Sequence, residues 1–275
     1  MILPRRVIVI FTLAIVLPAV AGPALADVSR CLAIANHMPR AQFAAFSPAA
    51  PVAPVALTQG EARLTYVGHS TFLIESAGGI RVATDFTGFA GAGVVPDVVT
   101  MNHAHTSHYT DTPDPRIRHV LRGWNPAGGP ARHDLTLGDV KIRNVPTDIR
   151  NFAGIREADG NSIFIFETAG LCIGHLGHLH HELGPEYLGL IGQLDIVLVP
   201  VDGGYTMAQA SMINVLKLLK ARLIIPMHYF GSATLATFLD GMREEFEVEI
   251  SVSPVLVVSV LTLPKSPTVL VLPGY

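Results

Sequence analysis

Three of the 12 histidines in this 275-residue chain lie within six positions, at His103, His105 and His108. The apolar run 94–99 comes just before them. Such a run predicts a strand, so the three imidazoles would lie on the loop where that strand ends and could converge there. Imidazole is a common zinc ligand, and several on one turn can form part of a metal cage. The spacing therefore favours a metal site over unrelated surface histidines.

The motif resembles the HxHxDH signature of the metallo-β-lactamase superfamily, with Ser107 where that signature has its aspartate. Other stretches are similar to the branch of small hydrolases that includes L-ascorbate-6-phosphate lactonase. These stretches are Gly68–Glu75, Thr84–Asp85, Val201–Met207 and Ile225–Tyr229. The resemblance covers about residues 60–240 in the family's order. It implies an α/β fold, the four-layer αββα sandwich of two facing sheets covered outside by helices.

In that family, two zinc ions lie at the edge of the sandwich and share a bridging carboxylate. By resemblance, His103 and His105 would bind the first metal. His108 and His228, the latter at the end of a buried strand, would bind the second.

Two further residues are expected near the metals by the same resemblance. Asp85 matches an aspartate that orients the histidine loop, although an ordinary turn aspartate is the alternative. His69 lies in a loop that faces the metals, where it could contact substrate or shuttle a proton. Tyr205 and Tyr229 flank motif positions; both could line the pocket, but we expect both to pack in the core.

Three ligand positions depart from the family pattern. Ser107 replaces one acidic ligand, and His178 stands where the bridging aspartate is expected. A later histidine is missing near residues 145–149, where only Asp148 could coordinate. A carboxylate can bridge two cations and offset their charge, whereas a neutral imidazole gives one nitrogen to one metal. We therefore expect one bound metal rather than two.

Histidine is added where the carboxylates are lost. His175, His178, His180 and His181 follow the apolar segment 171–173 within seven positions. We interpret His178 as a metal ligand and His175 as a core residue with one hydrogen bond. His180 and His181 would form a solvated loop or lie behind the ligands.

The expected site would hold one zinc ion through His103, His105 and His178, with His228 or Asp148. It would leave a position open for a metal-bound water that attacks the substrate. Nickel, copper or iron would also suit an imidazole set, so another divalent metal remains possible.

Hydrophobic periodicity predicts strands in both halves of the domain and helices mainly in the second half. The helices are expected at 207–220 and 233–242, with a short one at 29–38. Nearly uninterrupted apolar runs at 194–199 and 223–225 predict strands that are buried on both faces.

The N-terminal residues 1–26 have the features of a signal peptide. Arg5 and Arg6 precede the apolar run 7–20, and Ala24-Leu25-Ala26 supplies small residues for cleavage. An uncleaved anchor is the alternative, but the run is short and interrupted by proline, so we expect no stable membrane span after cleavage. The protein would then be periplasmic or secreted. An Ala/Pro-rich lead and connector at 27–59 would precede the catalytic domain at 60–275.

The composition limits the classes of binding partner that we expect. The chain is 49% hydrophobic and 15% charged, with a formal net charge of −3, so no basic surface predicts nucleic-acid binding. A small-molecule substrate is expected, and nothing indicates an oligomeric state. Cys31 and Cys172 could pair in an oxidising compartment, but Cys172 lies in an apolar strand and we predict two free thiols.

Three functions remain open at this point. The first is an exported metal-dependent hydrolase acting on an ester, lactone or phosphodiester. The second is a metal-binding pseudoenzyme of the same fold, which the missing carboxylates favour. The third is a structural or partner-binding module whose histidines hold no metal.

Overall fold

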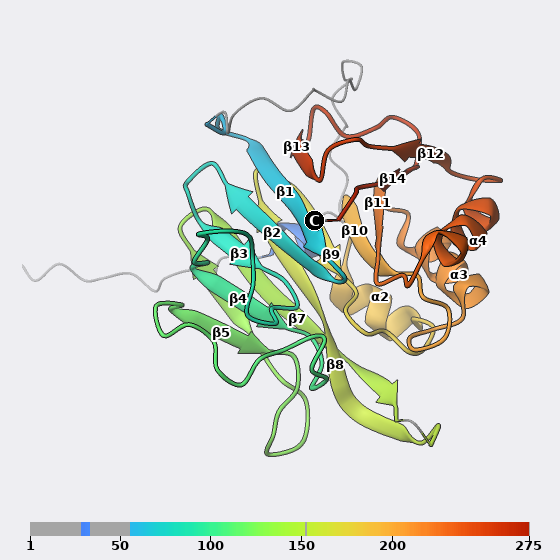
Figure 1. The fold of residues 1–275 in the computed structure, drawn as a ribbon, viewed down its shortest axis with the longest axis horizontal. Coiled ribbons are helices and arrows are strands. Elements are labelled where there is room, and N and C mark those ends of the chain that lie inside the picture. Colours follow the sequence, from blue (N-terminus) through green and yellow to red (C-terminus); the bar gives the residue numbers. More distant parts are fainter. Residues whose placement is uncertain (1–28, 34–55, 152, 275) are drawn as a thin grey trace, which may run out of the picture.

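Two β-sheets face each other in the computed structural model, which describes residues 29–33, 56–151 and 153–274 (Figure 1). The first sheet has six strands in the order β13-β1-β2-β3-β4-β5. Its β13-β1-β2-β3 part is antiparallel, and β3, β4 and β5 run parallel. The strands are β1 (Glu61–Gly68), β2 (Thr71–Ser76), β3 (Arg81–Ala83), β4 (Val98–Met101), β5 (His119–Arg122) and β13 (Val255–Ser259).

The second sheet has eight strands in the order β12-β14-β11-β10-β9-β8-β7-β6. Strands β9 to β12 and β14 are parallel, while β6 to β9 are antiparallel. Every residue of β10 and β11 is buried, as their apolar runs predict. The strands are β6 (Asp134–Leu137), β7 (Val140–Arg150), β8 (Arg156–Thr168), β9 (Leu171–His175), β10 (Ile196–Pro200), β11 (Leu223–Met227), β12 (Glu247–Ile250) and β14 (Thr268–Val271).

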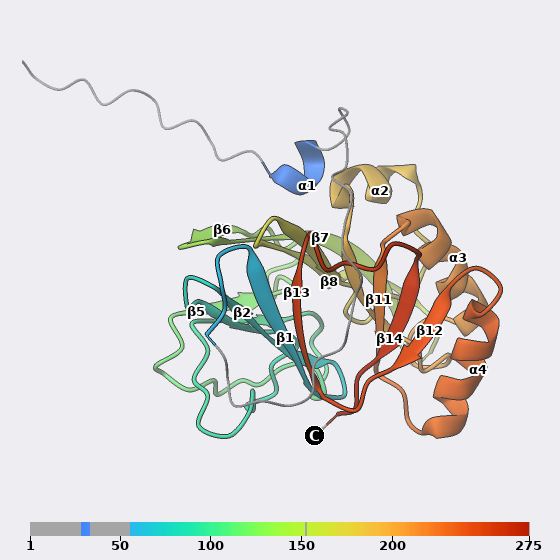
Figure 2. The same cartoon turned by 90° about the horizontal axis from the view of Figure 1, so that it is seen from above.

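Helices cover the outer face of the eight-stranded sheet (Figure 2). Helix α3 shows why, because its buried residues Met212, Val215, Leu216 and Leu219 form one apolar stripe. It ends at Lys220, whose φ of 53° gives a left-handed cap. The helices are α1 (Arg30–Ala33), α2 (Pro185–Ile191), α3 (Gln209–Leu219) and α4 (Ser232–Met242).

Loops cover the outer face of the six-stranded sheet in the described part of the chain. Phe86, Ala90 and Ile117 come from the segments that flank β4 and β5, and they pack with Val99 and Met101 of the sheet. Glycine and proline are frequent in these segments, which disfavours a helix there. The α/β sandwich is therefore confirmed, but loops take the place of one outer helical layer.

The predicted signal peptide 1–26 and most of the connector lie outside the described residues. Of the short helix expected at 29–38, α1 falls within them. Among the residues that the structure describes, no helix is both long and apolar enough to span a membrane.

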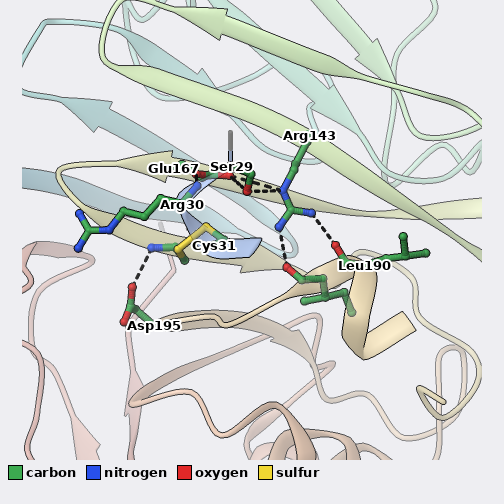
Figure 3. The surroundings of a disulfide bond; sticks show 9 residues. Ser29, Arg30, Cys31, Arg143, Glu167, Leu190 and Asp195 are labelled. Atoms are coloured by element: carbon green, nitrogen blue, oxygen red, sulfur yellow. Dashed lines mark hydrogen bonds and ion pairs between the residues drawn. A yellow bond between two sulfur atoms is a disulfide. The ribbon is translucent and has the colours of Figure 1, made fainter. Parts of the chain in front are cut away.

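A disulfide joins Cys31 of α1 to Cys172 of β9, so the prediction of two free thiols was wrong (Figure 3). The Cα atoms are 5.8 Å apart, within the range that a disulfide requires. Both cysteines are buried, and the Cys31 carbonyl accepts a hydrogen bond of 3.0 Å from the Gln193 amide. The apolar position of Cys172 indicated burial correctly, but the sequence could not show that α1 packs beside it.

Polar contacts fix the same segment against the sheet. The Ser29 hydroxyl and the Arg30 amide both hydrogen-bond the Glu167 carboxylate (Figure 3). The Arg143 guanidinium donates to Ser29 Oγ at 3.1 Å and to the carbonyls of Leu190 and Ile191 at 2.8 and 2.6 Å. The disulfide and Arg143 thus hold α1, β7 and α2 together.

We expect the Cys31→Ser/Cys172→Ser variant to lose about 2–5 kcal/mol of unfolding free energy, because the bond closes a loop across 141 positions. Urea unfolding without reductant measures this loss. Wild-type protein in dithiothreitol should match the variant, and the variant should not respond to dithiothreitol. Free thiols in unreduced, unfolded wild-type protein would contradict the assignment.

Candidate metal centre

Loops at one edge of the sandwich gather the histidines. The 103–108 loop follows β4, the 176–184 loop follows β9, Asp202 follows β10 and His228 follows β11. The turn between β1 and β2 brings His69 to the same place, where the His69 carbonyl accepts a 2.7 Å hydrogen bond from the His228 amide. The carboxyl ends of parallel strands are a common location for binding sites.

Three histidines form the tightest group. One ring nitrogen each from His69, His108 and His228 lie within 4.8 Å of one another. His108 and His228 are buried, and their Nε2 atoms are 3.2 Å apart. His69 Nε2 is buried and has no hydrogen-bond partner among the described residues. A buried nitrogen without a partner is costly unless a ligand binds it, so this group fits a metal.

A buried carboxylate holds each of two rings from behind. His108 Nδ1 is 2.8 Å from Asp85 Oδ2, and His228 Nδ1 is 3.0 Å from Asp202 Oδ2. Burial alone would raise the pKa values of both aspartates. For Asp85 the opposing charge of His108 outweighs burial, and for Asp202 the hydrogen bonds from His228 and Thr206 do so, so both pKa values fall below the usual value.

These contacts determine the tautomers. An ionised carboxylate can only accept, so Nδ1 of His108 and of His228 must carry the proton. In the neutral rings, both Nε2 atoms then present lone pairs, which face each other across 3.2 Å. The lone pairs repel unless a proton or a metal cation lies between them. The donor set therefore suits a divalent metal, with carboxylate–histidine pairs of the kind that orient metal ligands.

The backbone is strained at this group. Six described residues other than glycine have positive φ, and three of them are His69 (52°), Asp85 (42°) and His228 (54°). The left-handed region is unfavourable for residues with a Cβ, and such conformations concentrate at functional sites. Here the strained positions carry two imidazoles and one carboxylate that meet at one edge of the sandwich.

His103 and His105 lie beside this group. His103 Nδ1 donates to the Gly160 carbonyl at 2.7 Å, which leaves Nε2 unprotonated and able to bind a cation. His105 Nδ1 is 2.8 Å from Ser107 Oγ. Their ring centroids lie 6.3 and 6.1 Å from that of His108. Ser107 therefore supports a histidine at the position where the family has an acidic ligand.

The histidines of the 176–184 loop lie in two different surroundings. The His178 ring centroid lies 4.7 Å from that of His108 and 5.3 Å from that of His228, so His178 reaches the site. Its Nδ1 is 2.6 Å from His180 Nε2. His181 points elsewhere, since its Nε2 accepts the Asp148 amide at 3.2 Å.

His175 packs in the core as expected, although it makes more than one hydrogen bond. Its Nε2 is 2.8 Å from the Ser70 carbonyl, and its Nδ1 is 3.1 Å from both Asn102 Nδ2 and the Gly177 amide. The ring thus connects β9 to the histidine loop.

Asp148 does not join the histidines. Its Oδ2 is 2.5 Å from Arg156 Nε, and its Oδ1 accepts the Asp159 amide at 3.1 Å. With both oxygens occupied in this way, Asp148 is absent from the cluster that could hold a metal. We therefore omit it from the proposed ligand set.

Asp202 was missed as a site residue. Besides His228, its carboxylate accepts the amides of Gly204, Tyr205 and Thr206 at 2.9, 2.5 and 3.0 Å. Its place directly after the buried run 194–199 was the available signal, because residues at the carboxyl ends of buried parallel strands meet at one edge.

A cavity of about 630 Å³ opens over the histidines. Phe230 and Tyr205 line it with exposed rings whose centroids are 5.4 Å apart. The expectation that Tyr205 packs in the core was wrong, because the turn held by Asp202 exposes 64% of its surface. Tyr229 does pack against the core. Arg150 and Glu157 supply the charges of the wall.

Burial lowers the pKa values of five histidines that line the cavity, and neighbouring histidines add to the effect. The pKa falls to about 4 for His69 and for His180, where Arg150 also contributes. The pKa values of His103, His105 and His178 are lowered as well, mainly by burial. Neutral imidazoles at neutral pH are the form that binds metals.

The metal-free protein should therefore lose stability as the pH falls from about 6.5 to 4. The unfolded chain protonates near 6.5, whereas folded His69 and His180 resist protonation until about 4, so acid favours unfolding across that interval. We expect the Tm to drop by at least about 5 °C between pH 7 and pH 5. Calorimetry of the protein after removal of metal by a chelator measures this change in Tm. A His69→Gln/His180→Gln variant should show a shallower slope, and an equal slope would contradict this origin.

Comparison with known proteins gives an independent result. Residues 63–228 match the family model described as the β-lactamase superfamily domain. UPF0173 metal-dependent hydrolases of Archaeoglobus fulgidus and Methanosphaerula palustris are each 27% identical, over 198 and 203 residues. The alignments cover 61% and 67% of this chain and 83% and 91% of those proteins.

A solved structure from Thermotoga maritima, described as a Zn-dependent hydrolase of the metallo-β-lactamase superfamily, is also similar. It is 30% identical, with a TM-score of 0.59, and the match covers 78% of this chain and all of that one. The region matched by the family model includes both histidine loops, Asp202 and His228. The chain belongs to the metallo-β-lactamase superfamily.

Proposed function

We propose that this protein is a metal-dependent hydrolase that cleaves an ester, lactone or phosphodiester bond in a small molecule. The close group of His69, His108 and His228, with carboxylates behind two of the rings, is the observation that carries the proposal. The names of the relatives as metal-dependent hydrolases support it.

The proposed metal is one divalent cation, with zinc the best match for a set of imidazoles. His69, His108 and His228 would hold it, and His103 has an Nε2 free to assist. When bound, such a cation acts as a Lewis acid and makes hydroxide available near neutral pH. Asp85 and Asp202 keep the protons on Nδ1 of His108 and His228, so that the Nε2 lone pairs remain directed at the cation.

The cavity wall favours a particular kind of substrate. Phe230 and Tyr205 offer apolar ring faces beside His228. Arg150 has no carboxylate within ion-pair distance in the described structure, and it donates to the Thr206 carbonyl at 3.2 Å. Arg156 on the adjacent strand, in contrast, is paired with Asp148. An ester with a planar apolar group and an anionic substituent would complement these residues.

Extensively dialysed protein should retain about one divalent cation per chain. His228→Ala should bind it at least about tenfold more weakly, and Asp202→Asn about 10–100-fold more weakly because it releases the His228 ring. Elemental analysis and competition with a chelator of known affinity measure these changes. His181→Ala is the matched control and should bind as the parent does. Two retained cations in wild type would mean that the other histidines rebuild a second site.

A panel of aryl esters, lactones and phosphodiesters tests turnover. We expect at least one class to be hydrolysed by the zinc-loaded protein and not by His228→Ala, with anionic members preferred. Arg150→Gln should raise KM for anionic members by about tenfold and leave neutral ones unchanged. Metal binding without turnover on any class would favour the pseudoenzyme instead.

We also propose that the protein is exported. The signal-like residues 1–26 support this, as does the buried Cys31–Cys172 disulfide, because such bonds persist mainly in oxidising compartments. N-terminal sequencing of native material should find a start within a few residues of Asp27. An intact Met1 on a membrane-bound product would contradict export.

A further inference from the structure

The hydrogen bonds that start from β7 determine where the protons of His178 and His180 lie. The Arg150 backbone amide is 3.0 Å from His180 Nδ1. A backbone amide can only donate, so His180 Nδ1 must be unprotonated. His180 is therefore neutral and carries its single proton on Nε2.

The next bond passes this constraint to His178. His180 Nε2 is 2.6 Å from His178 Nδ1, and since His180 Nε2 carries the proton, His178 Nδ1 must accept it. His178 is then neutral as well, with its own proton on Nε2. No described residue forms a hydrogen bond with that Nε2, and the ring lines the cavity.

This tautomer is the opposite of the one seen at neighbouring rings. His103, His108 and His228 each donate through Nδ1 and keep a lone pair on Nε2, as a metal ligand requires. His178 directs an N–H at the cavity instead, although its ring lies 5.2 Å from that of His103. Binding a metal through Nε2 would force both rings to change tautomer and would break the bond from the Arg150 amide.

We propose that His178 is a hydrogen-bond donor to the substrate rather than a metal ligand. Its Nε2–H would stabilise the negative charge that develops on an oxygen of the scissile group, and the proton would remain on His178. His180 and the Arg150 amide act as positioning groups that keep the proton on Nε2. A neutral imidazole is a suitable donor for this purpose, because it stabilises an oxyanion without bringing a net charge. The role rests on the proposed hydrolase function, but the tautomer does not.

Long-range ¹H–¹⁵N spectra of histidine-labelled full-length protein test the tautomer without any substrate. We expect His178 to show a protonated Nε2 and an unprotonated Nδ1, both in chelated and in zinc-loaded protein. In His180→Ala the preference should be lost and the two nitrogens should approach averaged shifts. An unprotonated His178 Nε2 in either form of the wild type would overturn the proposal.

Metal affinity and kinetics test the role. His178→Ala should bind zinc within about twofold of wild type, whereas kcat should fall about 10²–10³-fold with little change in KM. His178→Gln, which retains an N–H donor, should recover part of that loss, and His180→Ala should lower kcat more mildly. His181→Ala is the matched control and should retain wild-type kcat.

The outcomes separate the two proposals. Loss of zinc in His178→Ala would make His178 a ligand and overturn the inference. Retained zinc with unchanged kcat would also overturn it. If wild type hydrolyses no substrate while the spectra show the expected tautomer, the hydrolase proposal fails and the assignment of the His178 proton stands.

Discussion

The approach of His108 Nε2 to His228 Nε2, at 3.2 Å, is the constraint on which the site depends. Two neutral imidazoles that face each other through lone pairs repel each other. Asp85 and Asp202 enforce that arrangement from behind, and the strained backbone at Asp85 and His228 shows that the fold supports it. The surrounding sandwich, with its fully buried β10 and β11, supplies the rigidity. A site of this kind is organised before any cation arrives.

Protons, more than residue types, distinguish the histidines at this edge. Seven of them converge near one cavity, and their chemistry differs because the hydrogen-bond partners of their ring nitrogens differ. A carboxylate or a carbonyl behind the ring leaves a lone pair on Nε2 of His108, His228 or His103, while hydrogen bonds that start at the Arg150 amide place the proton of His178 on Nε2. The loss of two acidic positions therefore need not leave a deficient copy of a two-metal site.

Much of the fold was predictable from periodicity and from the family motifs. The buried strands, α3 and α4 were placed within a few residues, and His69, His103, His105, His108, His178 and His228 do meet. What failed depended on contacts between distant segments. The pairing of Cys31 with Cys172 needs α1 to pack on β9. Asp148 forms an ion pair with Arg156 across the β7–β8 ladder and so does not face the histidines. The exposure of Tyr205 follows from the Asp202 turn, and helix α2 is too short for its apolar spacing to be evident.

The β7–β8 hairpin extends past the rest of its sheet (Figure 1). Its end contributes Ile149, Asn151, Gly154 and Glu157 to the lining of the cavity. The register shift between Thr147 and Ile149 marks where the arm departs from the regular ladder. The Arg150 amide, just beyond that shift, still donates to His180, whereas Asn151 and Gly154 lie farther out along the arm and line the cavity. Adding or removing a pair of residues there would keep the inward and outward alternation and alter only the reach of the arm. Evolution could thus change the size of accepted molecules by lengthening or shortening the hairpin beyond Arg150, while the contact between the Arg150 amide and His180 is kept.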